Sequence, residues 1–289
     1  MLKKIIITGV NGRIARHLTR YLAGWEGLYE VVLLSLRDDL WKDMSFQGYD
    51  AVIHLAALVH RKEKPSMEQQ FERLNVQLPR QVAQKAKEEG VGLFVYASSL
   101  AVYGLEGSVQ LPQTIDENTA ENPASLYGKS KWRGEQLVGR LNDEQFRVVV
   151  LRVPLVYGAG CKGSYGTLRA VALKLPMVPR MENRRSMIHL DNLSEFIRLL
   201  IERPSSGTFF PQNREFVCTS DLIQHVANAH GKRLRQSPFW GGFFRRFLGR
   251  LGLVEKIWGT LVIGKELSTT FGWDYNVLSF EDSFADESA

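Results

Sequence analysis

The chain has 289 residues, 44% of them hydrophobic and 24% charged, so it is a globular protein that can bury a substantial core in one large domain or two closely associated ones. Its two cysteines, Cys161 and Cys218, stand far apart without clustered histidines, so we expect neither a disulfide framework nor a metal site. The basic residues behind the net charge of +6 are scattered along the chain. We therefore expect no nucleic-acid partner, and an anionic small-molecule substrate accounts for the charge.

The apolar segments are too short for export or for a membrane span. The first residues run from Lys3 and Lys4 straight into Ile5-Ile6-Ile7, which is too short a run for the core of a secretory signal. No apolar run elsewhere approaches the roughly 18 residues of a membrane-spanning helix. We therefore expect a cytoplasmic protein.

Five apolar runs rich in β-branched residues alternate with helical segments up to residue 153. The helix after the first run has Ile14, Leu18 and Leu22 at helical spacing and ends near Gly24. A longer helical stretch contains Pro79, which should kink it or start a second helix there. Because the runs are apolar on both faces, they predict an α/β fold with a doubly wound parallel sheet. The predicted strands cover residues 3–8, 30–36, 51–55, 93–97 and 147–153, and the longer helical stretch covers residues 67–89.

The regular alternation of strand and helix ends after about Leu155. Gly, Pro and Arg concentrate between Gly158 and Arg185. We therefore expect a domain boundary there, with a first domain over residues 1–157 and a smaller lobe over residues 158–289, some segments of which return to the sheet.

A glycine-rich turn follows the first predicted strand directly and leads into the first helix. Gly9 allows the tight turn, Gly12 allows the backbone to approach a pyrophosphate, and Ala15 lets the helix pack near the strand. The amides at the helix N-terminus would then bind the phosphates. The turn predicts a dinucleotide site in a Rossmann-type domain, with an ordinary strand–helix turn as the alternative. We assign to this site Gly9, Asn11, Gly12, Arg13 and Ile14.

The end of the second strand distinguishes NAD from NADP, because an acidic side chain there accepts the ribose hydroxyls whereas an arginine accommodates a 2′-phosphate. Arg37 follows Ser35 and Leu36 where the acid is expected, and Asp38 and Asp39 come later. Arg37 therefore favours NADP(H), with NAD(H) as the alternative. A solvated surface arginine would fit the position almost as well.

Tyr127 and Lys131 stand four residues apart and so share one face of a predicted helix. A phenol has a pKa of about 10, and a nearby ammonium lowers it. Tyr127 can then exchange a proton with a substrate oxygen while a hydride moves to or from a nicotinamide. The strand that ends in Ser98 and Ser99 supports this assignment, because strand ends in such a sheet face the cofactor crevice. Capping of the following loop is the alternative for both serines.

Together these motifs resemble the extended short-chain dehydrogenase/reductases, specifically the NAD-dependent epimerase/dehydratase family, from Met1 to about Phe284. The resemblance implies that Ser99, Tyr127 and Lys131 are the catalytic residues. It also implies that the backbone after the third strand, from His54, lies beside the cofactor. The further cofactor-binding residues that it implies are Leu55, Ala56, Ala57, Asn75, Ala97, Ser98, Tyr127, Lys131 and Pro154.

Later segments resemble the substrate-binding part of the same family. Arg185 matches an arginine that contacts the substrate pyrophosphate, to which a guanidinium can donate two hydrogen bonds. The resemblance also places Ser99, Tyr103 and Lys162 at the substrate. Residues 156–163 and 183–186 look closest to the bacterial surface-polysaccharide branch, which includes 4-keto-reductases and UDP-sugar 4-epimerases. The family also implies a homodimer.

Two departures from the family pattern concern the adenosine end of the cofactor. The usual acid after the second strand is absent, and only about fifteen residues separate that strand from Ala51, so one strand–helix unit is shortened or lost. Both departures weaken the case for adenosine binding by Asp39 and Leu40.

Residues 239–258 combine bulky apolar side chains with Arg245, Arg246, Arg250 and Lys256. Such a segment suits the surface of a membrane, which would bring the protein into peripheral contact with it. The alternative is a helical cover over the second lobe, with Phe and Leu facing inwards and Arg facing water.

Three functions are consistent with these residues. The first is an oxidoreductase that reduces a C4 ketone of a nucleotide sugar with NADPH, in which Tyr127 supplies the proton, Ser99 orients the oxygen and Arg185 holds the diphosphate. The second is a UDP-sugar 4-epimerase with tightly bound NAD, and Arg37 favours the first over it. The third is a non-catalytic NADPH sensor, against which the intact set of Ser99, Tyr127 and Lys131 argues.

A dehydratase is disfavoured by the residues after Ser99. That chemistry needs an acid–base carboxylate pair beside the serine, and Leu100 and Ala101 stand there instead.

Overall fold

The computed structural model describes residues 1–59, 63–203, 205–249, 252–268, 272, 274–285 and 287. The chain forms two compact units. The first comprises Met1–Gly104, Ala120–Val153 and Leu193–Pro211, and the second comprises Leu105–Thr119, Pro154–Asn192 and Gln212–Ala289. A strand within Leu105–Thr119 pairs inside the second unit, and Leu193–Pro211 returns to the first unit.

The first unit is built on a six-stranded, fully parallel sheet in the order β10-β6-β4-β3-β1-β2. The apolar runs form these strands because both of their faces are covered: the side chains of Ile5, Ile6 and Ile7 are fully buried. This confirms the predicted α/β class. The strands are β1 (Lys3–Thr8), β2 (Tyr29–Leu34), β3 (Ala51–His54), β4 (Leu93–Ser99), β6 (Arg147–Val153) and β10 (Gly207–Phe209).

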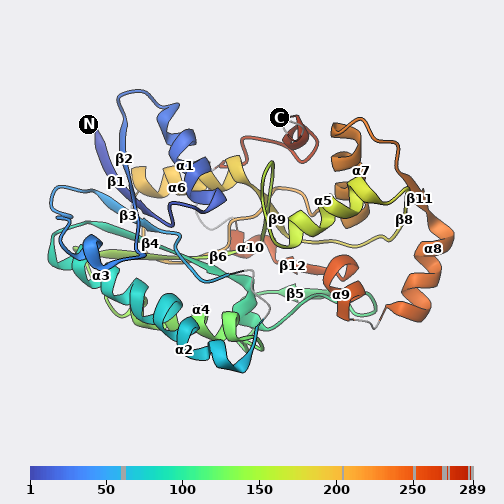
Figure 1. The fold of residues 1–289 in the computed structure, drawn as a ribbon, viewed down its shortest axis with the longest axis horizontal. Coiled ribbons are helices and arrows are strands. Elements are labelled where there is room, and N and C mark those ends of the chain that lie inside the picture. The colour runs from blue at the N-terminus through green and yellow to red at the C-terminus, as the bar shows by residue number, and fades with distance from the viewer. Residues whose placement is uncertain are drawn as a thin grey trace. The chain divides into compact units, whose positions relative to one another are not determined.

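Helices cover both faces of this sheet, as Figure 1 shows. One face carries α1 (Arg13–Ala23) and α6 (Leu190–Glu202), and the other carries α2 (Glu68–Phe71), α3 (Leu78–Glu88) and α4 (Leu126–Gly139). A π-helical turn, Glu72–Gln77, joins α2 to α3, and Pro79 stands in the first turn of α3. Pro79 thus starts a new helical segment, where its missing amide costs no hydrogen bond.

The connection from β2 to β3 is short. It contains only a 3-10 helix, Asp39–Lys42, so β2 is the edge strand of the sheet. The strand–helix unit that was predicted to be shortened or lost is replaced here by this 3-10 helix. Further 3-10 helices form at Pro65–Met67 and at Leu100–Tyr103.

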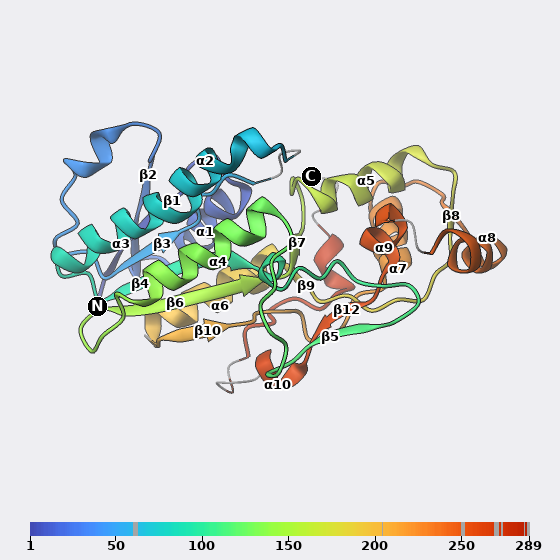
Figure 2. The ribbon, with the colours of Figure 1, turned by 90° about the horizontal axis from the view of Figure 1, so that it is seen from below.

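The second unit contains three pairs of short parallel strands. They are β7 (Leu155–Tyr157) with β9 (Met187–His189), β5 (Gln113–Ile115) with β12 (Leu261–Ile263), and β8 (Met177–Pro179) with β11 (Arg235–Ser237). Figure 2 shows β5 and β12 side by side. The helices are α5 (Ser164–Lys174), α7 (Thr219–Ala229), α8 (Pro238–Phe243), α9 (Gly252–Trp258) and α10 (Lys265–Ser268), with a π-helical turn at Phe244–Leu248 and a 3-10 helix at Asp282–Phe284.

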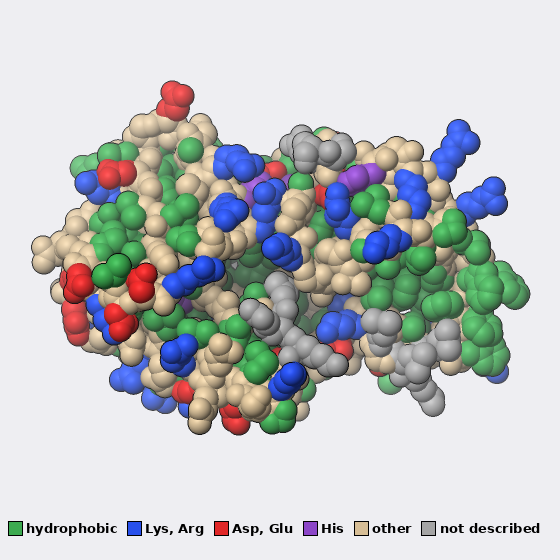
Figure 3. All heavy atoms as spheres, viewed as in Figure 1, with side chains coloured by type: hydrophobic (Ala, Val, Ile, Leu, Met, Phe, Trp, Pro, Cys, Tyr) green, Lys and Arg blue, Asp and Glu red, His purple; other side chains and the backbone are tan. Residues whose placement is uncertain are grey.

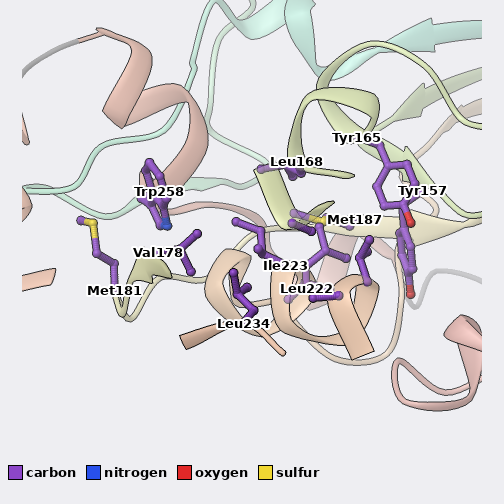
Figure 4. Close-up of a cluster of buried hydrophobic side chains, with 14 of the residues drawn as sticks. Tyr157, Tyr165, Leu168, Val178, Met181, Met187, Leu222, Ile223, Leu234 and Trp258 are labelled. Atoms are coloured by element: carbon purple, nitrogen blue, oxygen red, sulfur yellow. The ribbon is translucent and has the colours of Figure 1, made fainter. Parts of the chain in front are cut away.

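The core of the second unit lies between α5, α7 and α9. Leu168 on α5, Ile223 on α7 and Trp258 on α9 are buried in one cluster, and Figure 4 shows their side chains among those of the neighbouring strands. In the part of the chain that the structure describes, no helix is long and apolar enough to cross a membrane.

The predicted helical cover over residues 239–258 forms only in part. Trp258 is buried and Phe244 is half-buried, whereas Phe239 and Phe247 are exposed, so the expectation that the phenylalanines face inwards is wrong for those two. Arg250 lies outside the described residues.

Candidate active site

The loop between β1 and α1 is shaped to hold a phosphate group. Gly9 has a φ of 84°, and a Cβ there would lie 3.0 Å from the Ala56 nitrogen, so a side chain would close the gap between the loops after β1 and β3. Gly12 occupies the cap position of α1 and offers no side chain to the first amides of that helix. These amides therefore remain able to bind an anion, so the residues present fit the phosphates of a dinucleotide.

The other residues predicted at this turn lie beside it. Asn11 is exposed and its side-chain oxygen accepts a hydrogen bond of 3.3 Å from Arg16. Arg13 and Ile14 form the half-buried start of α1, and Ala15 is buried behind them, as close packing of the helix on the sheet requires.

The loop after β3 is fastened to the end of β1. The Thr8 hydroxyl oxygen accepts hydrogen bonds of 3.2 Å from the amides of both Leu55 and Ala56. His54 is buried and stacks beside Tyr96, and burial, followed by the charge of Lys131, lowers its pKa to about 3. His54 is therefore neutral at pH 7, and it is a structural group rather than a proton donor for the substrate.

Asn75 holds the same loop from the helical side. Its side-chain oxygen accepts a hydrogen bond from the Leu58 amide (2.7 Å), and its side-chain nitrogen donates to the Leu58 carbonyl (3.1 Å) and to the Ser130 hydroxyl (3.0 Å). Asn75 is fully buried. It thus ties the segment that includes Ala57 to α4 and fixes the backbone predicted to lie beside the cofactor.

Ser99, Tyr127 and Lys131 come together at the carboxyl end of β4. The side chains of Ser99 and Tyr127 are hydrogen-bonded to each other. The Ser99 oxygen also accepts a hydrogen bond from the Ala101 amide (3.2 Å), so it caps the following 3-10 helix as well. The Lys131 ammonium donates to the Ala97 carbonyl (2.6 Å) and lies 4.5 Å from the centre of the Tyr96 ring.

Burial sets the protonation of this pair. It raises the pKa of Tyr127 to about 12, and the hydrogen bond with Ser99 opposes the shift. It lowers the pKa of Lys131 to about 7, and the charge of Glu135 opposes that shift. Tyr127 is thus a neutral phenol at pH 7, the form that can donate a proton, and Lys131 changes its charge near neutral pH.

Two side chains that the sequence analysis did not assign hold the start of α4. The carboxylate of Glu63 accepts hydrogen bonds from the amides of Leu126 (2.8 Å) and Tyr127 (3.1 Å), and the Ser125 hydroxyl accepts one from Gly128 (3.0 Å). An acidic side chain at a helix N-terminus accepts hydrogen bonds from the unpaired amides and interacts favourably with the helix dipole. These contacts fix the position of Tyr127 along α4.

A buried ionic network next to the predicted catalytic residues was also missed by the sequence analysis. Glu135, one turn after Lys131 on α4, pairs with Arg152 of β6 (2.8 Å), which also pairs with Glu121 (2.6 Å). The Ser98 hydroxyl donates to Glu135, and Arg152 donates to the Tyr103 hydroxyl (2.7 Å).

Ser98 was expected to contact the cofactor and Tyr103 the substrate. In the structure, both side chains contact this ionic network instead. Ser98 is buried and its hydroxyl contacts Glu135, whereas the Ser99 hydroxyl contacts Tyr127. Burial raises the pKa of Tyr103, so its hydroxyl stays neutral beside Arg152. The helical spacing of Glu135 from Lys131 was the one signal in the sequence that could have pointed to it.

The adenosine end of the predicted site lies at the exposed end of β2. Arg37 is exposed there, and its amide donates to the Ser35 hydroxyl (3.4 Å). Asp38 caps the 3-10 helix through the Leu40 amide (3.2 Å), and Asp39 pairs with Lys42 (2.8 Å). Both acids thus have local partners within the short connection, and Arg37 is the first charged side chain after β2.

Three predicted residues, Pro154, Lys162 and Arg185, belong to the second unit. Pro154 is buried after β6, and Lys162 is exposed before α5. Arg185 donates to the carbonyls of Gly259 (2.9 Å) and Glu106 (3.3 Å). Burial lowers the pKa of Arg185 to about 10, opposed by the charge of Glu106, so it is a cation at pH 7.

Within the described ranges, no group of three or more His, Cys, Asp or Glu side chains is placed to hold a metal ion. What the first unit does assemble, at the carboxyl end of β4, is a neutral phenol, a serine hydroxyl and a buried amine. Such a set can move a proton on and off a substrate oxygen.

Comparison with known proteins identifies the family and the fold of this chain. Residues 5–210 match the profile of the NAD dependent epimerase/dehydratase family. A UDP-glucose 4-epimerase from Vibrio cholerae is 26% identical over 302 residues, covering 94% of this chain and 91% of that protein.

Two solved structures share the fold over almost the whole chain. A UDP-glucuronic acid 4-epimerase from Bacillus cereus in complex with NAD has a TM-score of 0.73 at 18% identity, covering 99% of this chain and 95% of that one. A dTDP-4-dehydrorhamnose reductase from Bacillus anthracis in complex with NADP has a TM-score of 0.71 at 19% identity, covering 99% and 98%.

Proposed function

The chain belongs to the NAD-dependent epimerase/dehydratase family, and on that premise we propose that it reduces a ketone at C4 of a UDP-sugar with NADPH. The observation that carries the proposal is the group formed by Ser99, Tyr127 and Lys131. Its phenol is neutral and hydrogen-bonded to a serine, and its buried amine has a pKa of about 7.

A nicotinamide cofactor held at the glycine-rich loop of Gly9 and Gly12 would supply a hydride to the C4 carbon. Tyr127 then gives its phenolic proton to the oxygen that becomes the new hydroxyl, and the Ser99 hydroxyl orients that oxygen by hydrogen bonding. Protonated Lys131 favours the phenolate left on Tyr127, because an opposite charge nearby stabilises the charged form. A proton taken up from water restores the phenol.

The cofactor assignment rests on two places in the first unit. Gly9 and Gly12 leave the phosphate-binding loop open, and Ala56 lies directly beside it. Arg37, exposed after β2 where an acid would select NAD, favours the 2′-phosphate of NADPH. Arg185 of the second unit is our candidate for binding the sugar diphosphate, since it is a half-buried cation. Lys162 and Tyr103 are further candidates for substrate contact.

The second candidate is a UDP-sugar 4-epimerase with tightly bound NAD. The Vibrio cholerae and Bacillus cereus proteins, both named as 4-epimerases, favour it. The same three catalytic residues would serve it, because an epimerase removes and returns one hydride at C4. Both candidates fit a role in cytoplasmic synthesis of surface-polysaccharide precursors by a homodimer.

The two candidates differ in how the cofactor is held. The protein should be purified without added cofactor, any bound nucleotide released by denaturation and identified, and the apo form titrated with NADPH and NADH. An empty site that prefers NADPH supports the reductase. Tightly held NAD after purification assigns the epimerase, and binding of neither cofactor overturns the catalytic proposal.

Replacing Tyr127 tests the chemistry separately. Tyr127→Phe should retain cofactor binding and lower turnover on the order of a hundredfold or more, because the general acid is removed. Tyr29→Phe, which removes another hydroxyl of the first unit that bonds Glu202, is the matched control and should turn over normally. Normal turnover by Tyr127→Phe would refute the role given to this residue.

A further inference from the structure

Four aromatic side chains stand on the outside of the second unit, along α8 and the π-helical turn that follows it. Phe239 and Phe247 are 76% and 67% exposed, and Trp240 and Phe243 are 41% and 39% exposed. Their ring centres follow one another at 5.8, 5.6 and 5.1 Å. We call these four residues the aromatic face, and Figure 3 shows a broad hydrophobic area over α8 at the right-hand edge.

The packing of α8 accounts for this exposure. Gly241 is buried, and a Cβ there would lie 1.8 Å from the Arg180 carbonyl oxygen, so this face of the helix lies tightly against β8. Phe244 turns inwards to the Trp258 ring, 6.0 Å between centres. With Gly241 and Phe244 on the inner side, the other aromatics are left in solvent. Contiguous apolar exposure of this kind marks an interaction surface.

The chain around the aromatic face is strongly basic. Residues 222–254 contain no Asp or Glu and six Lys or Arg, a charge as large as the net +6 of the whole chain. Of these six, the structure shows four arginines exposed, two before α8 and two in the π-helical turn. The six are Lys232, Arg233, Arg235, Arg245, Arg246 and Arg250.

This combination fits one kind of surface better than others. Aromatic rings bury well at the boundary between headgroups and acyl chains, and each nearby arginine is attracted to anionic lipids. A second copy of the chain would bring two equally basic surfaces together, which is repulsive. Single-stranded nucleic acid needs aromatic faces open for base stacking in a groove, whereas here the rings contact one another along a projecting helix.

We propose that the aromatic face of α8 and its flanking arginines dock this protein on an anionic lipid surface. The four rings enter the interfacial layer, and Arg245 and Arg246 contact the headgroups. This attachment is peripheral and reversible, because it rests on a short helix lying in the surface.

The test is co-sedimentation of the full-length protein with vesicles of phosphatidylcholine alone or mixed with phosphatidylglycerol. Wild type should bind the mixed vesicles, and raising the salt concentration should weaken binding. Arg245→Glu/Arg246→Glu should reduce partitioning about 25-fold or more, since each basic residue contributes about fivefold. Phe239→Ser/Phe247→Ser should reduce it about tenfold or more, because both rings lose their burial in the interface.

Matched controls come from the first unit. The exposed fraction of Leu40, 72%, is similar to that of Phe239. Arg140 is exposed at the end of α4. Leu40→Ser and Arg140→Glu should bind the vesicles as wild type does. Thermal unfolding of every variant, followed by circular dichroism, identifies any that lose binding through misfolding, and Phe239→Leu should then restore binding at that position.

A spectroscopic readout locates the contact directly. Tryptophan fluorescence should be quenched by brominated lipids in mixed vesicles, and Trp240→Phe should remove most of that quenching. Wild-type partitioning by the Phe239→Ser/Phe247→Ser variant would overturn the proposal. So would preferential binding of a single-stranded oligonucleotide, or a change in dimerisation without a change in vesicle binding.

Discussion

Two buried cations lie close to α4 in the first unit and behave differently. Lys131 has the Ala97 carbonyl and the Tyr96 ring as its close partners, and burial lowers its pKa to about 7. Arg152 pairs with the carboxylates of Glu135 and Glu121, and hydrogen bonds and charge from Glu135 raise its pKa against the effect of burial. The first can therefore change charge during a reaction, while the second is a permanent charge.

Glu135 connects the two cations. It pairs with Arg152 and also opposes the loss of charge on Lys131, which stands one turn earlier on the helix. A buried cation that is directly paired with carboxylates keeps its charge. A buried cation that only feels the charge of a carboxylate one helical turn away can lose its proton near neutral pH. The network around Arg152 is therefore structural, and the proposed chemistry is assigned to Lys131 and Tyr127.

The largest expected effect comes from breaking the structural pair. Glu135→Gln should lower the free energy of unfolding by about 3–5 kcal/mol, because it leaves Arg152 buried without its main partner. Glu72→Gln is the matched control, since Glu72 pairs with Arg133 at 2.7 Å on the surface and should cost about 1 kcal/mol or less. Urea unfolding measures both. Equal losses would mean that burial adds nothing to the Arg152 pair.

The next largest effect is the pH dependence of stability that Lys131, the titratable cation, should cause. Because the pKa of Lys131 falls from 10.5 unfolded to about 7 folded, the unfolded chain binds more protons between these values. Stability therefore rises with pH across this window, by up to about 1.4 kcal/mol per unit from this one group. Below the folded pKa both states are protonated and the slope disappears.

Lys131→Met should abolish that contribution. Urea unfolding from pH 7.5 to 9.5 measures the free energy of unfolding of both proteins. As the pH rises, wild type should gain stability relative to Lys131→Met. Lys129→Met, which changes an exposed lysine on the same helix, should show a flat difference. A flat difference for Lys131→Met as well would mean that this amine keeps its ordinary pKa.

The features that the sequence predicted well are local ones. Gly9 and Gly12 follow a strand within a few residues, and the four-residue spacing of Tyr127 and Lys131 places both on one helical face whatever lies around them. The alternation of apolar strands and helices likewise sufficed for the parallel sheet, and the short gap before Ala51 predicted the missing strand–helix unit.

The features that the sequence did not predict depend on distant segments meeting. Arg152 reaches Glu135 only because β6 lies beside β4 and both strands pack against α4. Glu121 comes from an irregular segment with no periodicity to place it. Which phenylalanines of α8 face solvent depends on Gly241 packing against the end of β8. The amino-acid sequence of α8 alone does not show that contact. Local spacing was enough to predict the candidate catalytic residues, whereas the contacts that support them depend on the tertiary fold.

The smallest expected loss of stability comes from removing single hydroxyl groups near the two cations. The Tyr103 hydroxyl accepts a hydrogen bond from the charged Arg152 (2.7 Å), whereas the Tyr96 hydroxyl donates to the neutral carbonyl of Asn75 (3.0 Å). Both side chains are buried, and Phe preserves both rings. Tyr103→Phe should therefore cost about 1.5–2 kcal/mol in urea unfolding and Tyr96→Phe about 1 kcal/mol, since hydrogen bonds to charged groups are the stronger. A reversed order would mean that the two carboxylates already satisfy Arg152, leaving Tyr103 free to serve the substrate.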